Sequence, residues 1–243
     1  MKNSDFSMAN NYFSFKQFTI NQDKCAFKVG TDGVLLGASA NVDGIKTILD
    51  IGTGTGLIAL MLAQRCNAEI IAIEPDNSSF EQAVKNVEKS KWSSRIKVEN
   101  TDLQNFNPGT LKFDLIVANP PYFTDSLKNP DSGKSATRHN VTLNSEDLLK
   151  GVNRLLVTGG RFQVIMPYVE GNIFIAEAQE YGFYCNNILK IKPLPTSEIR
   201  RLILTFSRQK QKVSEKFLTI EHGRRHEFTE EYINLTKDFY LKF

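Results

Sequence analysis

A chain of 243 residues is long enough for one sizeable α/β domain with a small appendage. Its 41% hydrophobic and 23% charged residues are typical of globular proteins, and no run approaches the roughly 20 apolar residues of a membrane-spanning helix. The N-terminal stretch MKNSDFSMANNYF lacks the apolar core of a signal peptide, so we expect a cytoplasmic protein.

Cysteine and histidine spacing does not predict a metal site. Cys25, Cys66 and Cys185 are widely separated and include no C-x-x-C pair, which favours ordinary buried thiols over disulfides. His222 and His226 are four residues apart, but no third ligand is suitably spaced. We therefore expect no metal.

The net charge of +3 is distributed unevenly. Residues 186–243 carry 12 Lys or Arg against 7 Asp or Glu, whereas residues 1–185 carry 18 against 20. A basic C-terminal region on a slightly acidic body indicates a polyanionic partner. A merely solvated basic surface is the alternative.

The first 40 residues predict a small extension. Residues 13–29 alternate loosely around the polar turn NQDK, which predicts a β-hairpin. The segment TDGVLLGASA at 31–40 predicts a short helix with Thr31 or Asp32 near its N-cap.

From Ile45 onward, strand and helix patterns alternate. Strands are predicted at 47–51, 69–75, 95–102, 113–119, 160–167, 183–194 and 199–209, with helices at 57–66, 77–90, 144–157 and 170–182. This alternation predicts an α/β fold with a Rossmann-like, doubly wound, mostly parallel seven-stranded sheet. A short Pro-containing turn joins the last two strands, so we expect them to form an antiparallel edge.

Two further stretches stand apart from this scaffold. Residues 123–143 are polar, contain Gly and Pro, and are too long for an ordinary connection, which predicts a mobile lid over a site. Near the C-terminus, Tyr232, Leu235, Phe239 and Tyr240 fall on one helical face, which predicts docking to the core.

The loop DIGTGTG follows a buried strand and precedes a helix. Glycines at 52, 54 and 56 allow a sharp turn and the close approach of a ligand to helix N-terminal amides. Leu57 occupies the position where a dinucleotide binder has its third glycine. Asp50 adds a carboxylate, which favours a cationic, amino-acid-bearing nucleoside over a pyrophosphate. A tight turn without a ligand is the alternative.

Two more carboxylates follow predicted parallel strands. Glu74 ends the second strand, where it can accept hydrogen bonds from both ribose hydroxyls, and Asp102 follows the third, where it can meet an adenine amine. Either could be a surface charge or a cap. Their shared position at strand ends favours a ligand, because such sheets bind ligands outside their carboxyl ends.

The stretch LIVANPPYF ends the fourth strand at two prolines, which cannot continue a central strand. The Asn119 side-chain oxygen and the Pro120 carbonyl can together hold the two N–H groups of a planar amine and orient its nitrogen toward a methyl donor. Tyr122 offers a stacking face worth about 1–3 kcal/mol per base. Positioning of this kind can supply roughly 7–11 kcal/mol. A rigid turn is the alternative.

In this order the four motifs resemble the class I S-adenosylmethionine-dependent methyltransferases that carry Asn-Pro-Pro-Tyr, over roughly residues 45–167. The resemblance implies S-adenosylmethionine as cofactor, with the glycine loop around its methionyl part. The implied catalytic residues are Asn119, Pro120, Pro121 and Tyr122. The implied cofactor-binding residues are Lys28, Thr31, Asp50, Gly52, Thr53, Gly54, Gly56, Glu74, Pro75, Asp102, Leu103 and Asn119.

A wider likeness covers nearly the whole chain. The segments FKVGTDGVLLGASA, ATRHNVTLNSEDLL and FTEEYINLTKDFYL resemble the bacterial tRNA1(Val) adenine-N6 methyltransferases, which modify the adenosine 3′ of the anticodon. This implies that Asp32 helps Lys28 and Thr31 to close the cofactor pocket. It also implies tRNA as partner, with RNA contacts at Arg138, His139, Arg224 and Arg225. Loop anchoring is the alternative for Arg138 and His139.

We therefore expect a monomeric RNA N6-adenine methyltransferase. The expected organisation is one domain over 1–243, with an extension at 1–44, a core at 45–208, and a basic tail with a helix at 209–243. Glutamine methylation in a release factor is the alternative enzyme, although those enzymes carry a helical N-terminal domain. DNA adenine methylation and a non-catalytic nucleoside-binding protein are further alternatives.

Overall fold

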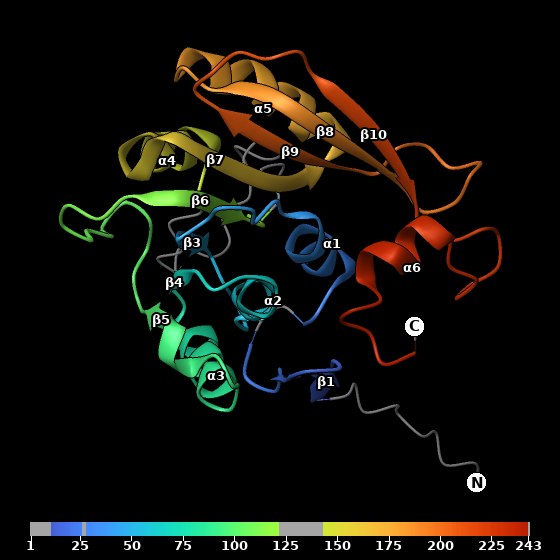
Figure 1. The fold of residues 1–243 in the computed structure, drawn as a ribbon, viewed down its shortest axis with the longest axis horizontal. Coiled ribbons are helices and arrows are strands. Elements are labelled where there is room, and N and C mark those ends of the chain that lie inside the picture. Colours follow the sequence, from blue (N-terminus) through green and yellow to red (C-terminus); the bar gives the residue numbers. More distant parts are fainter. Residues whose placement is uncertain (1–10, 26–27, 122–142, 243) are drawn as a thin grey trace, which may run out of the picture.

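The computed structural model describes residues 11–25, 28–121 and 143–242 (Figure 1). Its main sheet has eight strands in the order β10-β8-β9-β7-β6-β3-β4-β5. They are β3 (Thr47–Ile51), β4 (Glu69–Ile73), β5 (Ile96–Glu99), β6 (Phe113–Ala118), β7 (Leu156–Pro167), β8 (Tyr184–Lys192), β9 (Arg201–Ser207) and β10 (Ser214–Thr219).

The strand directions confirm the predicted mostly parallel sheet. β5, β4, β3, β6 and β7 are neighbours in parallel, and β9 runs antiparallel to both β7 and β8. The prediction of seven strands was wrong by one, because β10 pairs in parallel with β8 and forms the outer edge. Four of its six residues are exposed and two are charged, so its own sequence has little strand character. Backbone pairing with β8 determines its conformation.

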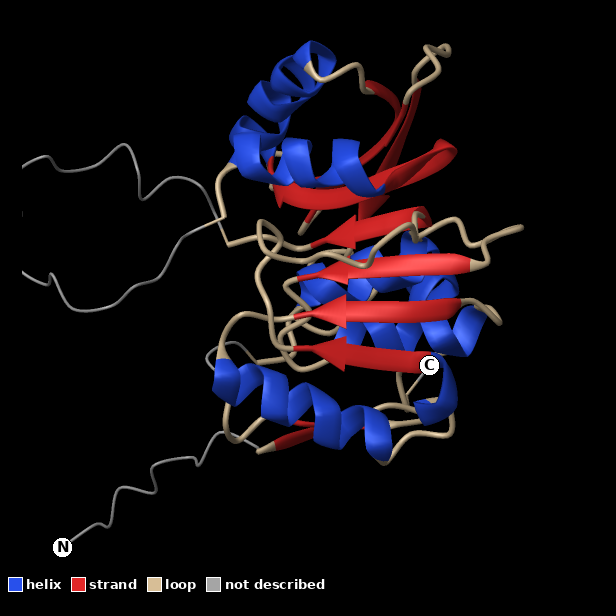
Figure 2. Ribbon diagram, turned by 90° about the vertical axis from the view of Figure 1, so that its left-hand side faces the viewer, coloured by secondary structure: helices blue, strands red, loops and turns tan. Residues whose placement is uncertain are grey.

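Helices cover both faces of the sheet (Figure 2). They are α1 (Thr31–Ser39), α2 (Leu57–Arg65), α3 (Asn77–Glu88), α4 (Ser145–Leu155), α5 (Tyr168–Glu180) and α6 (Glu230–Thr236), with a 3-10 turn, η1, at Ser93–Arg95. Successive strand residues point to opposite faces. In β3, Ile48 therefore joins the core with α1 and α2, whereas Leu49 joins the core with α4 and α5. Among the described residues, no helix combines the length and the apolar character needed to cross a bilayer.

The N-terminal hairpin is confirmed, but its turn was predicted at the wrong place. β1 (Tyr12–Ser14) pairs antiparallel with β2 (Thr19–Asn21), and the Phe15 N–H donates to the Phe18 carbonyl across the turn at 2.8 Å. The segment NQDK instead begins with the last residue of β2 and then runs over α3. Its residues hydrogen-bond to side chains of α3 and to the backbone of Val29, as described below, and do not form the hairpin turn.

The C-terminal stripe docks to the core, as predicted. Tyr232 and Phe239 are almost completely buried in the same hydrophobic cluster as α1, α2 and the N-terminal hairpin. The Lys16 N–H donates to the Phe239 carbonyl at 2.8 Å, so the first and last described segments are bonded together. The predicted lid at 123–143 lies outside the described residues except for its last position.

Candidate functional site

The ends of three adjacent parallel strands bring the main candidate residues together. Ile51 of β3 is in register with Ile73 of β4 and with Ala118 of β6. The residues that follow these three positions are Gly52, Glu74 and Asn119, so they lie side by side at the carboxyl edge of the sheet. Figure 2 shows the central strands pointing toward this same edge. The expectation that the motifs share one edge is therefore met.

The glycine loop between β3 and α2 requires its glycines. Gly52, Gly54 and Gly56 have φ values of 68°, 57° and 83°, in the left-handed region that disfavours other residues. The Gly52 and Thr53 N–H groups donate to the Ile73 carbonyl at 2.9 and 3.1 Å. A Cβ at Gly52 or Gly54 would have no heavy atom of the described residues within 4 Å. The loop therefore has a fixed conformation and open space beside it.

Asp50 is fully buried beneath this loop. The Thr53 hydroxyl donates to its Oδ2 at 2.6 Å, whereas Oδ1 has no hydrogen-bond partner among the described residues. Burial raises the pKa of the Asp50 carboxyl to about 7. A buried carboxylate oxygen without a donor costs free energy, and a bound cation would offset that cost.

Glu74 anchors the loop from the neighbouring strand. Its Oε2 accepts from the Gly54 N–H at 2.9 Å, and its Oε1 accepts from the Asp76 N–H at 3.0 Å. The side chain is 8% exposed, and this burial raises the pKa of its carboxyl. Because a carboxylate has about four acceptor positions, both oxygens can still accept hydroxyl donors. Asn100, which the sequence did not single out, holds the Glu74 and Pro75 carbonyls through its Nδ2.

Asp102 lies one strand further along the edge, after β5. Its Oδ1 accepts from the Asn105 N–H at 2.7 Å and its Oδ2 from the Asn105 side chain at 2.9 Å, so Asp102 stabilises a turn. Leu103 is 2% exposed and belongs to the core with α4. The neighbouring Asp102 is half-buried.

Asn119 faces the start of α1. Its Nδ2 is 4.0 Å from the position that a Cβ on Gly33 would take, and Leu57 of α2 is 3.0 Å from the same position. Asp32, one residue earlier in α1, accepts from the Arg201 Nε at 2.7 Å. The N-terminus of α1 is therefore packed against the strand ends, which places the exposed Thr31 beside this edge, with Lys28 three residues before it.

No described contact brings the remaining candidates next to Asn119. Arg224 and Arg225 are exposed in the turn after β10, at the other end of the sheet order from β5. Tyr122, Arg138 and His139 lie outside the described residues. Sequence reasoning also missed Asn86, a buried polar residue of α3. The available signal was its position on the apolar face of that helix.

Residues 48–139 match a family model described as a methyltransferase domain. A curated tRNA1(Val) (adenine(37)-N6)-methyltransferase from Bacteroides fragilis is 48% identical over 237 residues, covering 97% of this chain and 100% of the relative. Another from Phocaeicola vulgatus is 50% identical over 234 residues, covering 96% and 99%. The chain belongs to this methyltransferase family.

Solved methyltransferase structures share the fold of this family member. A crystal structure titled as a predicted O-methyltransferase from Agrobacterium tumefaciens has a TM-score of 0.64 at 21% identity, covering 86% of this chain and 96% of that one. A ribosomal protein L11 methylase from Lactobacillus delbrueckii has a TM-score of 0.53 at 20% identity, covering 82% of each chain. Both confirm the predicted Rossmann-like α/β architecture.

Proposed function

We propose that this chain transfers a methyl group from S-adenosylmethionine to the N6 amine of an adenosine in tRNA, namely adenosine 37 of tRNA1(Val). The substrate is the one in the names of the relatives. The observation that carries the chemistry is the register of β4, β3 and β6, which places Glu74, the glycine loop and Asn119 at adjacent strand ends.

The residues at this edge fit the cofactor. Asp50 has a buried oxygen without a donor among the described residues, which suits a ligand that carries positive charge. The space beside Gly52 and Gly54 admits its methionyl part, and Glu74 retains acceptor positions for the ribose hydroxyls. A glycopeptide N-methyltransferase solved in complex with S-adenosylmethionine has the same fold, with a TM-score of 0.56 at 12% identity. When bound, the cofactor supplies an electrophilic methyl group on a sulfonium.

Asn119 and Pro120 hold the acceptor amine. The Asn119 amide oxygen and the Pro120 carbonyl accept the two N–H groups of the adenine amine, which directs the nitrogen lone pair toward the cofactor pocket. The new N–C bond would form as the sulfonium S–CH3 bond breaks to leave the neutral thioether, and the methylated amine would release one proton to water. Alignment of this kind contributes roughly 7–11 kcal/mol, so no strong base is needed. Pro121 stiffens the exit of β6, and Tyr122 stacks on the base.

The rest of the chain binds the substrate RNA and completes the cofactor pocket. In this proposal Lys28, Thr31 and Asp32 border the cofactor, and Thr53, Pro75, Asp102 and Leu103 complete its surroundings. Arg138, His139, Arg224 and Arg225 contact phosphates. The hairpin, the core strands and α6 share one hydrophobic cluster, which supports a single methyltransferase domain over the chain. A tRNA substrate implies the cytoplasm.

Mass spectrometry of tRNA nucleosides tests the proposal. A bacterial strain that lacks N6-methyladenosine at position 37 of tRNA1(Val) would be compared with and without this chain. We expect the modified nucleoside at that position only when the chain is expressed. Its absence there, together with methylated glutamine in a release factor, would replace this function by the alternative one.

A further inference from the structure

Asn86 of α3 makes every hydrogen bond that its side chain allows. Its Oδ1 accepts from the Asn21 N–H at 2.9 Å and from the Asn21 side-chain Nδ2 at 3.1 Å. Its Nδ2 donates to the Asn21 carbonyl and to the Thr55 carbonyl, both at 2.9 Å. The side chain is 1% exposed. An amide has two donors and two acceptor positions, so this buried group is fully satisfied by two distant segments.

One of these segments is the glycine loop. Thr55 lies between Gly54 and Gly56, and Gly56 packs on α3, where its Cβ position would be 3.6 Å from the Ala83 Cβ. The bonds from β4 and Glu74 hold the first half of the loop, from Gly52 to Gly54. Asn86 holds the second half through the Thr55 carbonyl.

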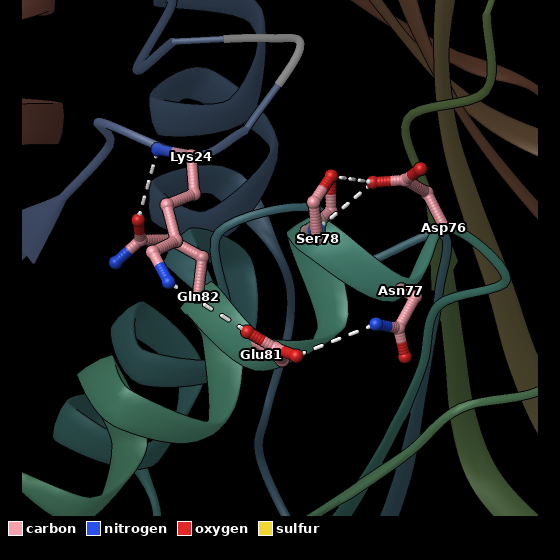
Figure 3. A network of polar contacts seen from close by, with 7 residues as sticks. Lys24, Asp76, Asn77, Ser78, Glu81 and Gln82 are labelled. Carbon is pink, nitrogen blue, oxygen red and sulfur yellow. Dashed lines mark hydrogen bonds and ion pairs between the residues drawn. The ribbon is translucent and has the colours of Figure 1, made fainter.

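The other segment, which we call the strap, runs from Asn21, the last residue of β2, toward the start of α1 and comprises residues 21–25 and 28–30. The Lys24 N–H donates to the Gln82 Oε1 at 3.2 Å, and the Val29 N–H donates to the Gln22 Oε1 at 2.8 Å. Figure 3 shows Lys24 lying over α3 beside Gln82 and Glu81. Asp76 caps the same helix, because its Oδ2 accepts from the Ser79 N–H at 2.8 Å and also from the Ser78 hydroxyl. The strap therefore rests on α3 before it enters α1.

The helices that follow the two segments meet at the candidate site. The glycine loop leads into α2, and the strap leads into α1, whose Gly33 is close to both Leu57 and Asn119. Asn86 lies on the third turn of α3, away from the strand ends, and bonds to both segments at once. Its contacts fix the strap and the loop relative to each other.

We propose that Asn86 is a positioning residue for the cofactor: it holds the glycine loop and the strap together so that both segments are in place before the ligand binds. This inference rests on the proposed function. It assigns to the N-terminal extension a part in cofactor affinity. A buried amide whose role is only structural would affect stability without affecting that affinity.

The test uses the nearly isosteric Asn86→Asp variant in the full chain. Its carboxylate faces the Asn21 and Thr55 carbonyls and donates to neither when it is ionised. We expect calorimetry to show a dissociation constant for S-adenosylhomocysteine that is at least 10-fold higher than that of the wild-type chain. The KM for S-adenosylmethionine should rise similarly, while kcat at saturating cofactor falls less than 3-fold and the KM for tRNA is unchanged.

Val87→Ala is the matched control. Val87 is the next residue of α3, is 4% exposed and packs in the hydrophobic core, and its apolar side chain cannot hydrogen-bond to the loop or the strap. We expect it to lower the melting temperature while leaving the cofactor dissociation constant unchanged. If Asn86→Asp behaves like this control, Asn86 is only structural and the inference is wrong. A wild-type chain that does not bind S-adenosylhomocysteine would instead overturn the proposed function itself.

Hydrogen–deuterium exchange of the wild-type chain keeps the inference testable if the variant does not fold. The Asn21 and Lys24 amides bond to α3 side chains, so their exchange reports the attachment of the strap. Saturating S-adenosylhomocysteine should slow exchange in the peptide spanning 20–25 at least 3-fold. Unchanged exchange there would show that strap and cofactor are not coupled, which contradicts the proposal.

Discussion

Asn119 is the residue on which the proposed transfer depends most. In Asn119→Ala the carboxamide that accepts an amine hydrogen is lost, while the glycine loop and Glu74 keep their contacts with each other. We expect the methyl-transfer rate to fall at least 100-fold with nearly unchanged S-adenosylmethionine binding, as measured by single-turnover kinetics and calorimetry. Normal turnover in this variant would remove the amine-holding role.

Asp50 links the stability of the cofactor-free protein to pH. Burial raises the pKa of this carboxyl from 3.8 to about 7, so the folded chain binds its proton more tightly than the unfolded chain. Its favourable contribution is complete below about pH 4 and is lost as the pH rises through about 7. The loss is at most about 4 kcal/mol, from 1.36 kcal/mol per pKa unit.

We therefore expect the cofactor-free chain to melt at a lower temperature at pH 8 than at pH 5.5. In Asp50→Asn this difference should shrink, because the amide cannot ionise. Asp43→Asn, at an exposed carboxylate, is the control and should keep the wild-type difference. An equal difference in Asp50→Asn and the wild-type chain would show that Asp50 does not titrate in this range.

At the scale of elements, the contact of α4 with the turn after β5 fixes the position of Asp102. A Cβ on Gly151 of α4 would be 2.5 Å from the Leu103 side chain, so the helix and the turn are in direct contact. Arg154, also on α4, donates to the Leu103 and Phe106 carbonyls at 2.8 and 2.7 Å. Any side chain larger than hydrogen at position 151 would therefore displace Leu103.

Gly151→Ala should destabilise the chain although alanine favours helices. Overpacking of a core costs about 1–3 kcal/mol, which outweighs a gain in helix propensity of about 1 kcal/mol. We expect a lower urea midpoint and a higher KM for S-adenosylmethionine, because Leu103 must shift and carries Asp102 with it. Gly159→Ala is the control, since no heavy atom of the described residues lies within 4 Å of its Cβ position. A urea midpoint equal to that of Gly159→Ala would show that the Leu103 side chain moves aside without a measurable loss of stability.

The elements differ in how far local sequence determines them. The central strands and α2 to α5 were predictable because buried residues repeat with strand or helix periodicity. Asp50 lies within such a strand, and Glu74 and Asn119 directly follow one. β10 was not predictable, because pairing with β8 forms it. Asn86 was missed for the same reason: its partners Thr55 and Asn21 are 31 and 65 residues away.

At the scale of the whole molecule, the two ends of the chain complete one structure around the sheet. Tyr240 contacts the rings of both Phe13 and Phe15, and the Gln64 side chain of α2 donates to the Asp238 carbonyl at 2.8 Å. α6 also contacts α1, whose start borders Asn119. The C-terminal segment therefore supports the site indirectly through α1. It belongs to the basic region at residues 186–243.

That basic region extends away from the site along the sheet. β10 is four strand spacings, about 19 Å, from β6, and Arg224 and Arg225 follow its carboxyl end. Arg224 is 87% exposed, and its contact with Glu227 at 3.9 Å is too exposed to neutralise it. An RNA that places one base at Asn119 can extend across β7, β9 and β8 to reach both arginines.

The double variant Arg224→Glu/Arg225→Glu tests this path. We expect at least a 10-fold higher KM for tRNA, and a slope of log affinity against log salt that is flatter by roughly 2, since each lost phosphate contact removes about 0.9. The cofactor dissociation constant should not change. The control with the same change in charge is Lys46→Glu/Lys97→Glu. Lys46 directly precedes β3 and Lys97 is the second residue of β5, so both lie toward the amino ends of these strands, away from the carboxyl edge. This control variant should bind tRNA almost normally. If both double variants weaken tRNA binding equally, the RNA responds to net charge rather than to the C-terminal surface. If the first weakens the cofactor instead, the turn after β10 is structural.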